Sequence, residues 1–292
     1  MSDVRDGRVA VRWQNEPLEL AYREWPGHGA PIVLLHGLAS NKGIWNLVAE
    51  RLAPTWRVVA LDQRGHGLSD KPNGGYDFAT MADDLRQAFA ALGIDRPLLV
   101  GHSWGGNVAL DFAANVRPGP RALALVDGGF IELSRRMTWE EAQERLRPPH
   151  IEMPVAELKQ RMRDRLGDRW TPAWEEATLG NFWVDEVGVV HRNLAVENHM
   201  RILCAMYGQR PSELFTRVEC PTYLIPADPP ADAPQRDASW RADREAFLRL
   251  AEQALGGPPK ARTFWMRETV HDVPLHRPDE LAALLGELAA VP

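Results

Sequence analysis

Val100-Gly101-His102-Ser103-Trp104-Gly105-Gly106 is the most informative stretch of the chain. It follows a short apolar run at residues 98–100, which is typical of a buried strand. It leads into residues 104–116, where apolar side chains recur at helical spacing. A strand that turns at once into a helix strains its turn residue, and the glycines at 101 and 105 give that turn room. The pattern predicts that the Ser103 hydroxyl stands exposed at a sharp bend.

Composition limits the classes of function. The chain has 292 residues, of which 45% are hydrophobic, enough for one large domain or a domain with an inserted subdomain. The net charge of −6 argues against a nucleic-acid partner. No apolar run could span a bilayer and no signal peptide is evident, so we expect no membrane partner. Two cysteines without metal-ligand spacing favour a reducing compartment, and we expect a cytoplasmic protein.

Apolar strand patterns alternate with helix patterns along most of the chain. This alternation predicts an α/β fold with a doubly wound, mostly parallel sheet. The clearest helix pattern spans residues 80–92, with Thr80 as the expected cap and Gly93 as the stop. The alternation breaks between residues 130 and 217, where we expect helices and no clear strand. We therefore predict a core domain from residues 1–129 and 218–292, and a helical cap insertion at 130–217.

Four motifs together resemble those of the α/β-hydrolase family. They are His36-Gly37 after a strand, Asp62-x-Arg64-Gly65-His66-Gly67-x-Ser69, the Gly-x-Ser-x-Gly bend, and His271-x-x-Pro274-x-x-x-Pro278 before the last helix. The resemblance implies a sheet of eight strands with a helical cap often inserted after the sixth, which is where residues 130–217 fall.

The resemblance also implies a role for each motif. Ser103 matches the nucleophile, and His271 matches the base that a serine hydroxyl needs. The N–H groups of Trp104 and Leu38 match the donors that stabilise an oxyanion. His36 and His66 belong to motifs that shape the backbone.

The third triad member stays open between two aspartates. The family usually supplies it beyond the seventh strand, within a Gly-x-x-Asp context. Here that segment reads Pro226-Ala227-Asp228-Pro229-Pro230, so Asp228 lies two residues early. Asp127, at the end of the predicted sixth strand, is the alternative that some members of the fold use. Both fit the chain order serine, acid, histidine.

Serine at the bend narrows the chemistry. Epoxide hydrolases and haloalkane dehalogenases of this fold carry an aspartate there, so Ser103 favours acyl transfer to water. We expect a serine hydrolase that cleaves a small or medium carboxylic ester or lactone, with no cofactor and no metal. The alternatives are a ligand-binding pseudo-enzyme, and a C–C bond hydrolase or perhydrolase on the same scaffold. The expected partner is a small-molecule ester, and the sequence predicts no oligomeric state.

Aromatic residues of the insertion could line a pocket or pack the cap, namely Trp139, Trp170, Trp174, Phe182, Trp183 and Tyr207.

Overall fold

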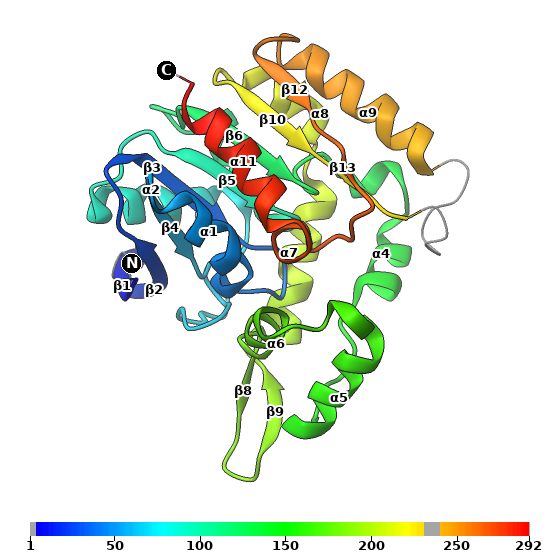
Figure 1. The fold of residues 1–292 in the computed structure, drawn as a ribbon. Coiled ribbons are helices and arrows are strands. Elements are labelled where there is room, and N and C mark those ends of the chain that lie inside the picture. The colour runs from blue at the N-terminus through cyan, green and yellow to red at the C-terminus, as the bar shows by residue number, and fades with distance from the viewer. Residues whose placement is uncertain (1–3, 231–239, 292) are drawn as a thin grey trace.

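The computed structural model describes residues 4–230 and 240–291. Its centre is an eight-stranded sheet with the strand order β1-β2-β4-β3-β5-β6-β10-β12 (Figure 1). The first two pairings in that order are antiparallel, and the other five are parallel. The predicted doubly wound α/β sheet is therefore confirmed. The strands are β1 (Arg5–Trp13), β2 (Glu16–Trp25), β3 (Gly29–Leu35), β4 (Trp56–Leu61), β5 (Leu98–His102), β6 (Ala122–Val126), β10 (Thr222–Ile225) and β12 (Ala261–Thr263).

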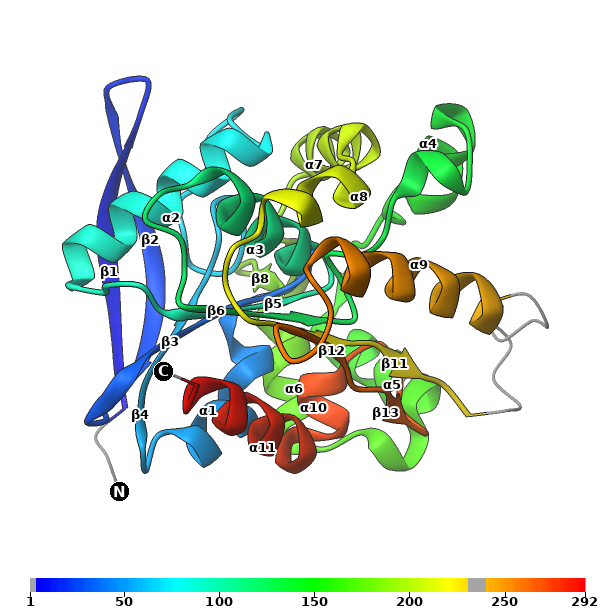
Figure 2. The same ribbon diagram turned by 90° about the horizontal axis from the view of Figure 1, so that it is seen from above.

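Helices cover both faces of the sheet, which explains why its central strands are apolar on every side. The residues of β5 and β6 are all buried. One face packs against α2 (Phe78–Leu92), α3 (Trp104–Asn115) and α9 (Trp240–Ala254). The other face packs against α1 (Asn46–Leu52) and α11 (Pro278–Ala289), as Figure 2 shows.

Helix α2 begins earlier than its sequence pattern suggests. Its cap is Asp77, whose carboxylate accepts the Thr80 backbone N–H at 2.9 Å and the Thr80 hydroxyl at 2.8 Å. The expectation that Thr80 caps the helix is wrong, because Thr80 lies inside the first turn and supplies donors to the true cap. The predicted stop is confirmed, since Gly93 has φ 60°.

Residues 130–217 contain helices and a small antiparallel sheet. The helices are α4 (Trp139–Leu146), α5 (Val155–Leu166), α6 (Pro172–Leu179), α7 (Val196–Gly208) and α8 (Pro211–Leu214). The strands are β7 (Met153–Pro154), β8 (Phe182–Val184) and β9 (Val189–Arg192). The expectation of no strand here is wrong. A turn at Gly188, with φ 85°, pairs β8 with β9, and the Trp183 ring stacks on His191 with centroids 4.3 Å apart.

The chain after β10 forms a second, smaller sheet and the last helices. The sequence pattern predicts one last strand over residues 261–266, but the structure divides it, because the chain leaves the main sheet after β12 at Thr263. A short β13 (Met266–Arg267) pairs in parallel with β11 (Ala227–Asp228) in a separate two-stranded sheet. Helix α10 (Val273–His276) then precedes α11. The irregular Asp/Pro segment expected at 227–237 lies partly outside the described residues. Within residues 4–230 and 240–291, no helix has the length and apolarity needed to cross a bilayer.

Candidate active site

Ser103 occupies the sharp turn between β5 and α3. Its φ of 53° and ψ of −125° are strained for a residue with a side chain. The turn is held by two hydrogen bonds, from Ser103 N to the Val126 carbonyl and from Gly106 N to the Ser103 carbonyl, both 2.9 Å long. The helix that starts immediately after Ser103 points its N-terminus at this residue, which favours negative charge there.

Glycines let the backbone pack tightly around this turn. A Cβ on Gly101 would lie 2.2 Å from the Gly105 carbonyl oxygen, and one on Gly105 would lie 2.6 Å from the Leu35 carbonyl oxygen. A Cβ on Gly128, which follows β6, would lie 1.9 Å from the Ser103 carbonyl oxygen. No side chain fits at those distances, so glycine at these positions holds Ser103 between β3 and the end of β6.

The His271 ring lies between Ser103 and a carboxylate. Its Nε2 is 2.9 Å from Ser103 Oγ, and its Nδ1 is 2.6 Å from Asp127 Oδ2. Since a carboxylate can only accept, Nδ1 carries the proton and Nε2 is left to accept from the Ser103 hydroxyl. The loop that holds the ring is fixed by His102, whose Nε2–H donates to the His271 carbonyl at 2.8 Å.

Asp127 is buried at the end of β6 in a conformation with φ 44°. Its Oδ1 accepts the Ala227 N–H at 2.9 Å and also contacts the Arg244 guanidinium. Burial pushes the pKa of Asp127 upward, but the hydrogen bond from His271 and the charge of Arg244 outweigh it and hold that pKa below its usual value. The carboxylate is therefore anionic at neutral pH.

The other candidate acid, Asp228, faces a different partner. Its Oδ2 accepts from Arg241 Nη1 at 2.6 Å. Both nitrogens of the His271 ring are already engaged by Asp127 and Ser103. Of the two aspartates considered from the sequence, Asp127 is the one that contacts the ring.

The histidines near Ser103 differ in proton affinity. Partial desolvation of its half-exposed ring lowers the pKa of His271, but the hydrogen bond and charge of Asp127 outweigh this effect, so the net shift of the pKa is upward. Burial and the neighbouring His271 lower the pKa of His102 to about 4. Burial also lowers the pKa values of His36 and His66. Among these four rings, only His271 has its pKa raised, and it is the one in contact with the Ser103 hydroxyl.

The loop after β3 lies directly against Ser103. A Cβ on Gly37 would lie 2.9 Å from Ser103 Cβ. Two buried rings fix this loop: Nε2 of His36 accepts the Gln63 N–H at 3.0 Å, and Nε2 of His66 accepts the Ala39 N–H at 3.2 Å. Leu38 therefore follows a loop residue that contacts the serine, and Trp104 follows the serine itself. Their oxyanion roles stay predictions.

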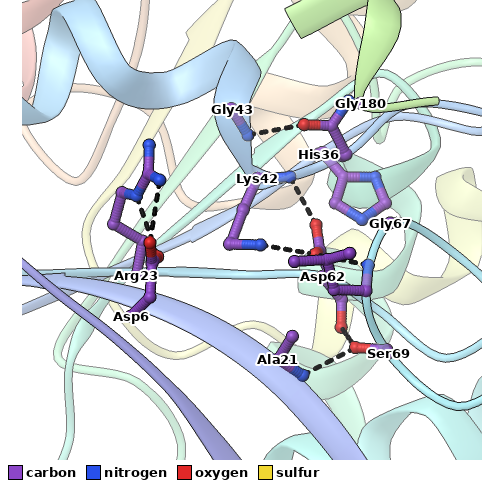
Figure 3. Close-up of polar contacts among 12 residues, drawn as sticks. Asp6, Ala21, Arg23, His36, Lys42, Gly43, Asp62, Gly67, Ser69 and Gly180 are labelled. Carbon is purple, nitrogen blue, oxygen red and sulfur yellow. Dashed lines mark hydrogen bonds and ion pairs between the residues drawn. The ribbon is translucent and has the colours of Figure 1, made fainter. Parts of the chain in front are cut away.

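A second buried hydrogen-bond network, centred on Asp62, holds the chain that follows this loop. Asp62 accepts the backbone N–H and the Nζ of Lys42, each at 2.7 Å, and the Leu68 N–H at 2.9 Å. Ser69 links the same turn to β2, because its Oγ accepts the Ala21 N–H at 2.8 Å (Figure 3). The Asp62 motif therefore ties the start of the helix after the β3 loop to the turn at Leu68.

Two contributors to the site were not identified from the sequence. Lys42 is buried against Asp62, and Arg244 is buried against Asp127. Arg244 lies in an ordinary amphipathic helix pattern, so no local signal marks it. In the described part of the chain, no group of three or more His, Cys, Asp or Glu side chains is arranged to hold a metal ion.

Comparison with known proteins agrees with this architecture. Residues 30–192, more than half of the chain, match the family model described as alpha/beta hydrolase fold. The soluble epoxide hydrolase of Corynebacterium sp. (strain C12) is 43% identical over 101 residues, 35% of this chain and 35% of that protein. The 2-(acetamidomethylene)succinate hydrolase of Mesorhizobium japonicum is 36% identical over 101 residues, 35% of this chain and 36% of that protein.

These alignments span only about a third of the length of the curated relatives. A solved structure of E-2-(acetamidomethylene)succinate hydrolase superposes over nearly the whole fold, with a TM-score of 0.77. It covers 98% of this chain and 100% of that one, at 19% identity, and so shows a shared fold. On the family match and this topology, the chain belongs to the α/β-hydrolase family.

Proposed function

We propose that this chain is a serine hydrolase that cleaves a small or medium carboxylic ester or lactone through an acyl-enzyme. One observation carries the proposal. A single imidazole accepts from the Ser103 hydroxyl at 2.9 Å while it donates to a buried carboxylate at 2.6 Å. Such an arrangement activates a hydroxyl that is otherwise a poor nucleophile at neutral pH.

The proposed reaction has two halves that use the same groups. Ser103 Oγ attacks the ester carbonyl while His271 Nε2 takes its proton, and the resulting imidazolium is stabilised by Asp127. The N–H groups of Leu38 and Trp104 hold the developing oxyanion. His271 then gives its proton to the leaving alcohol, which leaves an acyl group on Ser103. Water then attacks the acyl carbonyl while His271 Nε2 takes its proton, and His271 returns that proton to Ser103 Oγ as the acyl–Oγ bond breaks and the carboxylic acid is released.

Residues 130–217 are proposed to be the cap over this site. Two anchors support the proposal. The Asn41 side chain, just beyond the loop that carries Leu38, donates to the Ala177 carbonyl at 2.7 Å. On the other side, Asn107 of α3 donates to Gln209 Oε1 at 2.7 Å. The insertion is thus attached next to both backbone segments proposed to hold the oxyanion.

A second candidate function uses the same triad on another bond. The relatives named for hydrolysis of 2-(acetamidomethylene)succinate favour including amide substrates beside esters. C–C bond cleavage and perhydrolysis are chemically compatible alternatives. The likeness to an epoxide hydrolase carries less weight, because Ser103 occupies the position where epoxide hydrolases of this fold carry aspartate.

The test combines turnover with covalent labelling. The wild-type chain should hydrolyse p-nitrophenyl acetate or butyrate and react with a fluorophosphonate probe. Ser103→Ala and His271→Ala should abolish both while retaining the wild-type circular dichroism spectrum. Ser134→Ala, which removes a serine hydroxyl outside the triad, should retain both. No labelling of the wild type, together with saturable binding of a small molecule, would instead establish the pseudo-enzyme alternative.

A further inference from the structure

We propose that Arg244 is a positioning residue that locks the Asp127 carboxylate and lowers the affinity of His271 for protons. The proposal rests on the function proposed above and adds a fourth member to the chain of contacts behind Ser103. Helix α9 supplies this residue, which no sequence pattern singled out.

The geometry assigns one carboxylate oxygen to His271 and the other to Arg244. Asp127 Oδ2 faces His271, whereas Oδ1 faces the Arg244 guanidinium and the Ala227 N–H. The side chains of Arg244 and Asp127 are only 8% and 7% exposed. The guanidinium also lies over the Phe130 ring, 5.1 Å from its centroid, which fixes its approach to the carboxylate. The carboxylate therefore cannot rotate without breaking a contact at one of its two ends.

The position of the Arg244 guanidinium, on the side of Asp127 away from His271, determines the direction of its electrostatic effect on the protonation of His271. Asp127 stabilises the imidazolium of His271, and Arg244 offsets part of that stabilisation because it places positive charge beside the same anion. His271 should therefore lose its proton at a lower pH than it would beside Asp127 alone. The neutral ring is the form that accepts from Ser103, so Arg244 extends the active range toward acid pH.

Other charged groups near this cluster bear on the size of the effect. His271 is faced by Asp127 from the end of β6, by His102 from the end of β5 and by its chain neighbour Asp272. The charge of Arg136 lowers the pKa of Arg244, and the charge of Asp228 raises it. These groups are common to the wild type and the variants below, so a change in the titration of His271 reports Arg244.

The fold supplies a matched control one helical turn away. Arg241 donates to Asp228 Oδ2 at 2.6 Å, as Arg244 does to Asp127. Both arginines lie on α9, and each pairs with an aspartate at or just beyond the end of a strand. The two pairs differ in that only Asp127 contacts the His271 ring. Replacing Arg241 therefore removes a similar ion pair but leaves Asp127, the carboxylate that contacts His271, with all of its partners.

The experiment is an NMR titration of the His271 ring in the full chain, without substrate. Arg244→Gln should raise the titration midpoint of His271 by about one pH unit. Arg244→Lys should raise it less, and Arg241→Gln should leave it at the wild-type value. The acid limb of the pH profile of kcat/KM for p-nitrophenyl butyrate should move by the same amount. An unchanged midpoint in Arg244→Gln, or an equal shift in Arg241→Gln, would overturn the proposal.

Two further readouts keep the proposal testable. If Arg244→Gln does not fold, the side-chain Nη resonances of Arg244 in the wild type should titrate with the midpoint of His271. Resonances that stay constant through that midpoint would overturn the proposal. Because these titrations need no turnover, a chain that shows the shift but cleaves no ester would refute the proposed function alone.

Discussion

Replacing the two candidate acids one at a time gives the sharpest test of the site. Asp127→Asn keeps the shape of the side chain but removes the charge behind His271. The amide can donate to Nδ1, in which case the ring carries its proton on Nε2 and can no longer accept from Ser103. Asp228→Asn makes the same chemical change beside Arg241, away from the ring. We expect a large loss of activity from the first substitution and a small one from the second.

The contact distances set the size of the loss. With Nδ1 and Oδ2 2.6 Å apart, the two charges are separated by about 4 Å, which corresponds to about 4 kcal/mol at an effective dielectric constant of about 20. Half of the His271 side chain is exposed, so solvent screening reduces this to about 3 kcal/mol. That alone lowers kcat about 10²-fold. The wrong tautomer of His271 lowers kcat further. The corresponding Asp→Asn substitution in a serine-protease triad lowers kcat about 10⁴-fold.

The assay is p-nitrophenyl butyrate hydrolysis at a pH above the acid limb, with kcat and KM measured separately. Asp127→Asn should lower kcat by about 10² to 10⁴-fold with little change in KM. Asp228→Asn should stay within about fivefold of the wild type, because its ion pair with the partly exposed Arg241 contributes at most about 1 kcal/mol. Equal losses from the two variants, or full activity in Asp127→Asn, would refute this reasoning.

Three further predictions concern the base, the buried charges and the loop beside Ser103. Because Asp127 raises the pKa of His271, kcat/KM should fall with decreasing pH about a midpoint above 6.5, and a midpoint below that value would contradict the assignment. Arg64→Met should lower the free energy of unfolding in urea by about 3–5 kcal/mol, because it leaves the buried carboxylate of Asp84 on α2 without its ion-pair partner. Arg86→Ala, which breaks an exposed ion pair with Asp83 on the same helix, should lower that free energy by less than about 1 kcal/mol. Gly37→Ala should lower kcat/KM about 10²-fold by displacing the serine, whereas Gly208→Ala, whose added Cβ meets no atom within 4 Å, should leave it unchanged.

Much of the sheet could be predicted because its strands are continuous apolar runs between turn signals. The strand–turn–helix pattern around Ser103 singled out that residue, whereas His271 was assigned through the resemblance of its motif to those of the α/β-hydrolase family. The acid could not be chosen this way. Asp127 and Asp228 both follow strands, and only the packing of loops in space decides which one reaches the ring.

Other features depended on contacts that no local pattern encodes. Arg244 contacts a carboxylate 117 residues away, and its helix pattern is the same as that of a surface helix. The β8–β9 hairpin was not predicted, because acidic residues in its turn interrupt the apolar strand pattern. In the structure, Asp185 of this turn pairs with His191. Thr80 is a good capping residue in isolation, but Asp77 offers a carboxylate that takes two hydrogen bonds from it.

The hydrogen bond between His271 and Ser103 joins residues 168 positions apart. While the polypeptide is being synthesised, the serine bend and its glycines can be complete long before the imidazole emerges from the ribosome. Under the proposed mechanism the hydroxyl lacks its base during that interval, and a half-made chain should not attack esters around it. The same mechanism predicts that fluorophosphonate labelling begins only when the last loop and helix dock, so the onset of labelling would report the final step of folding.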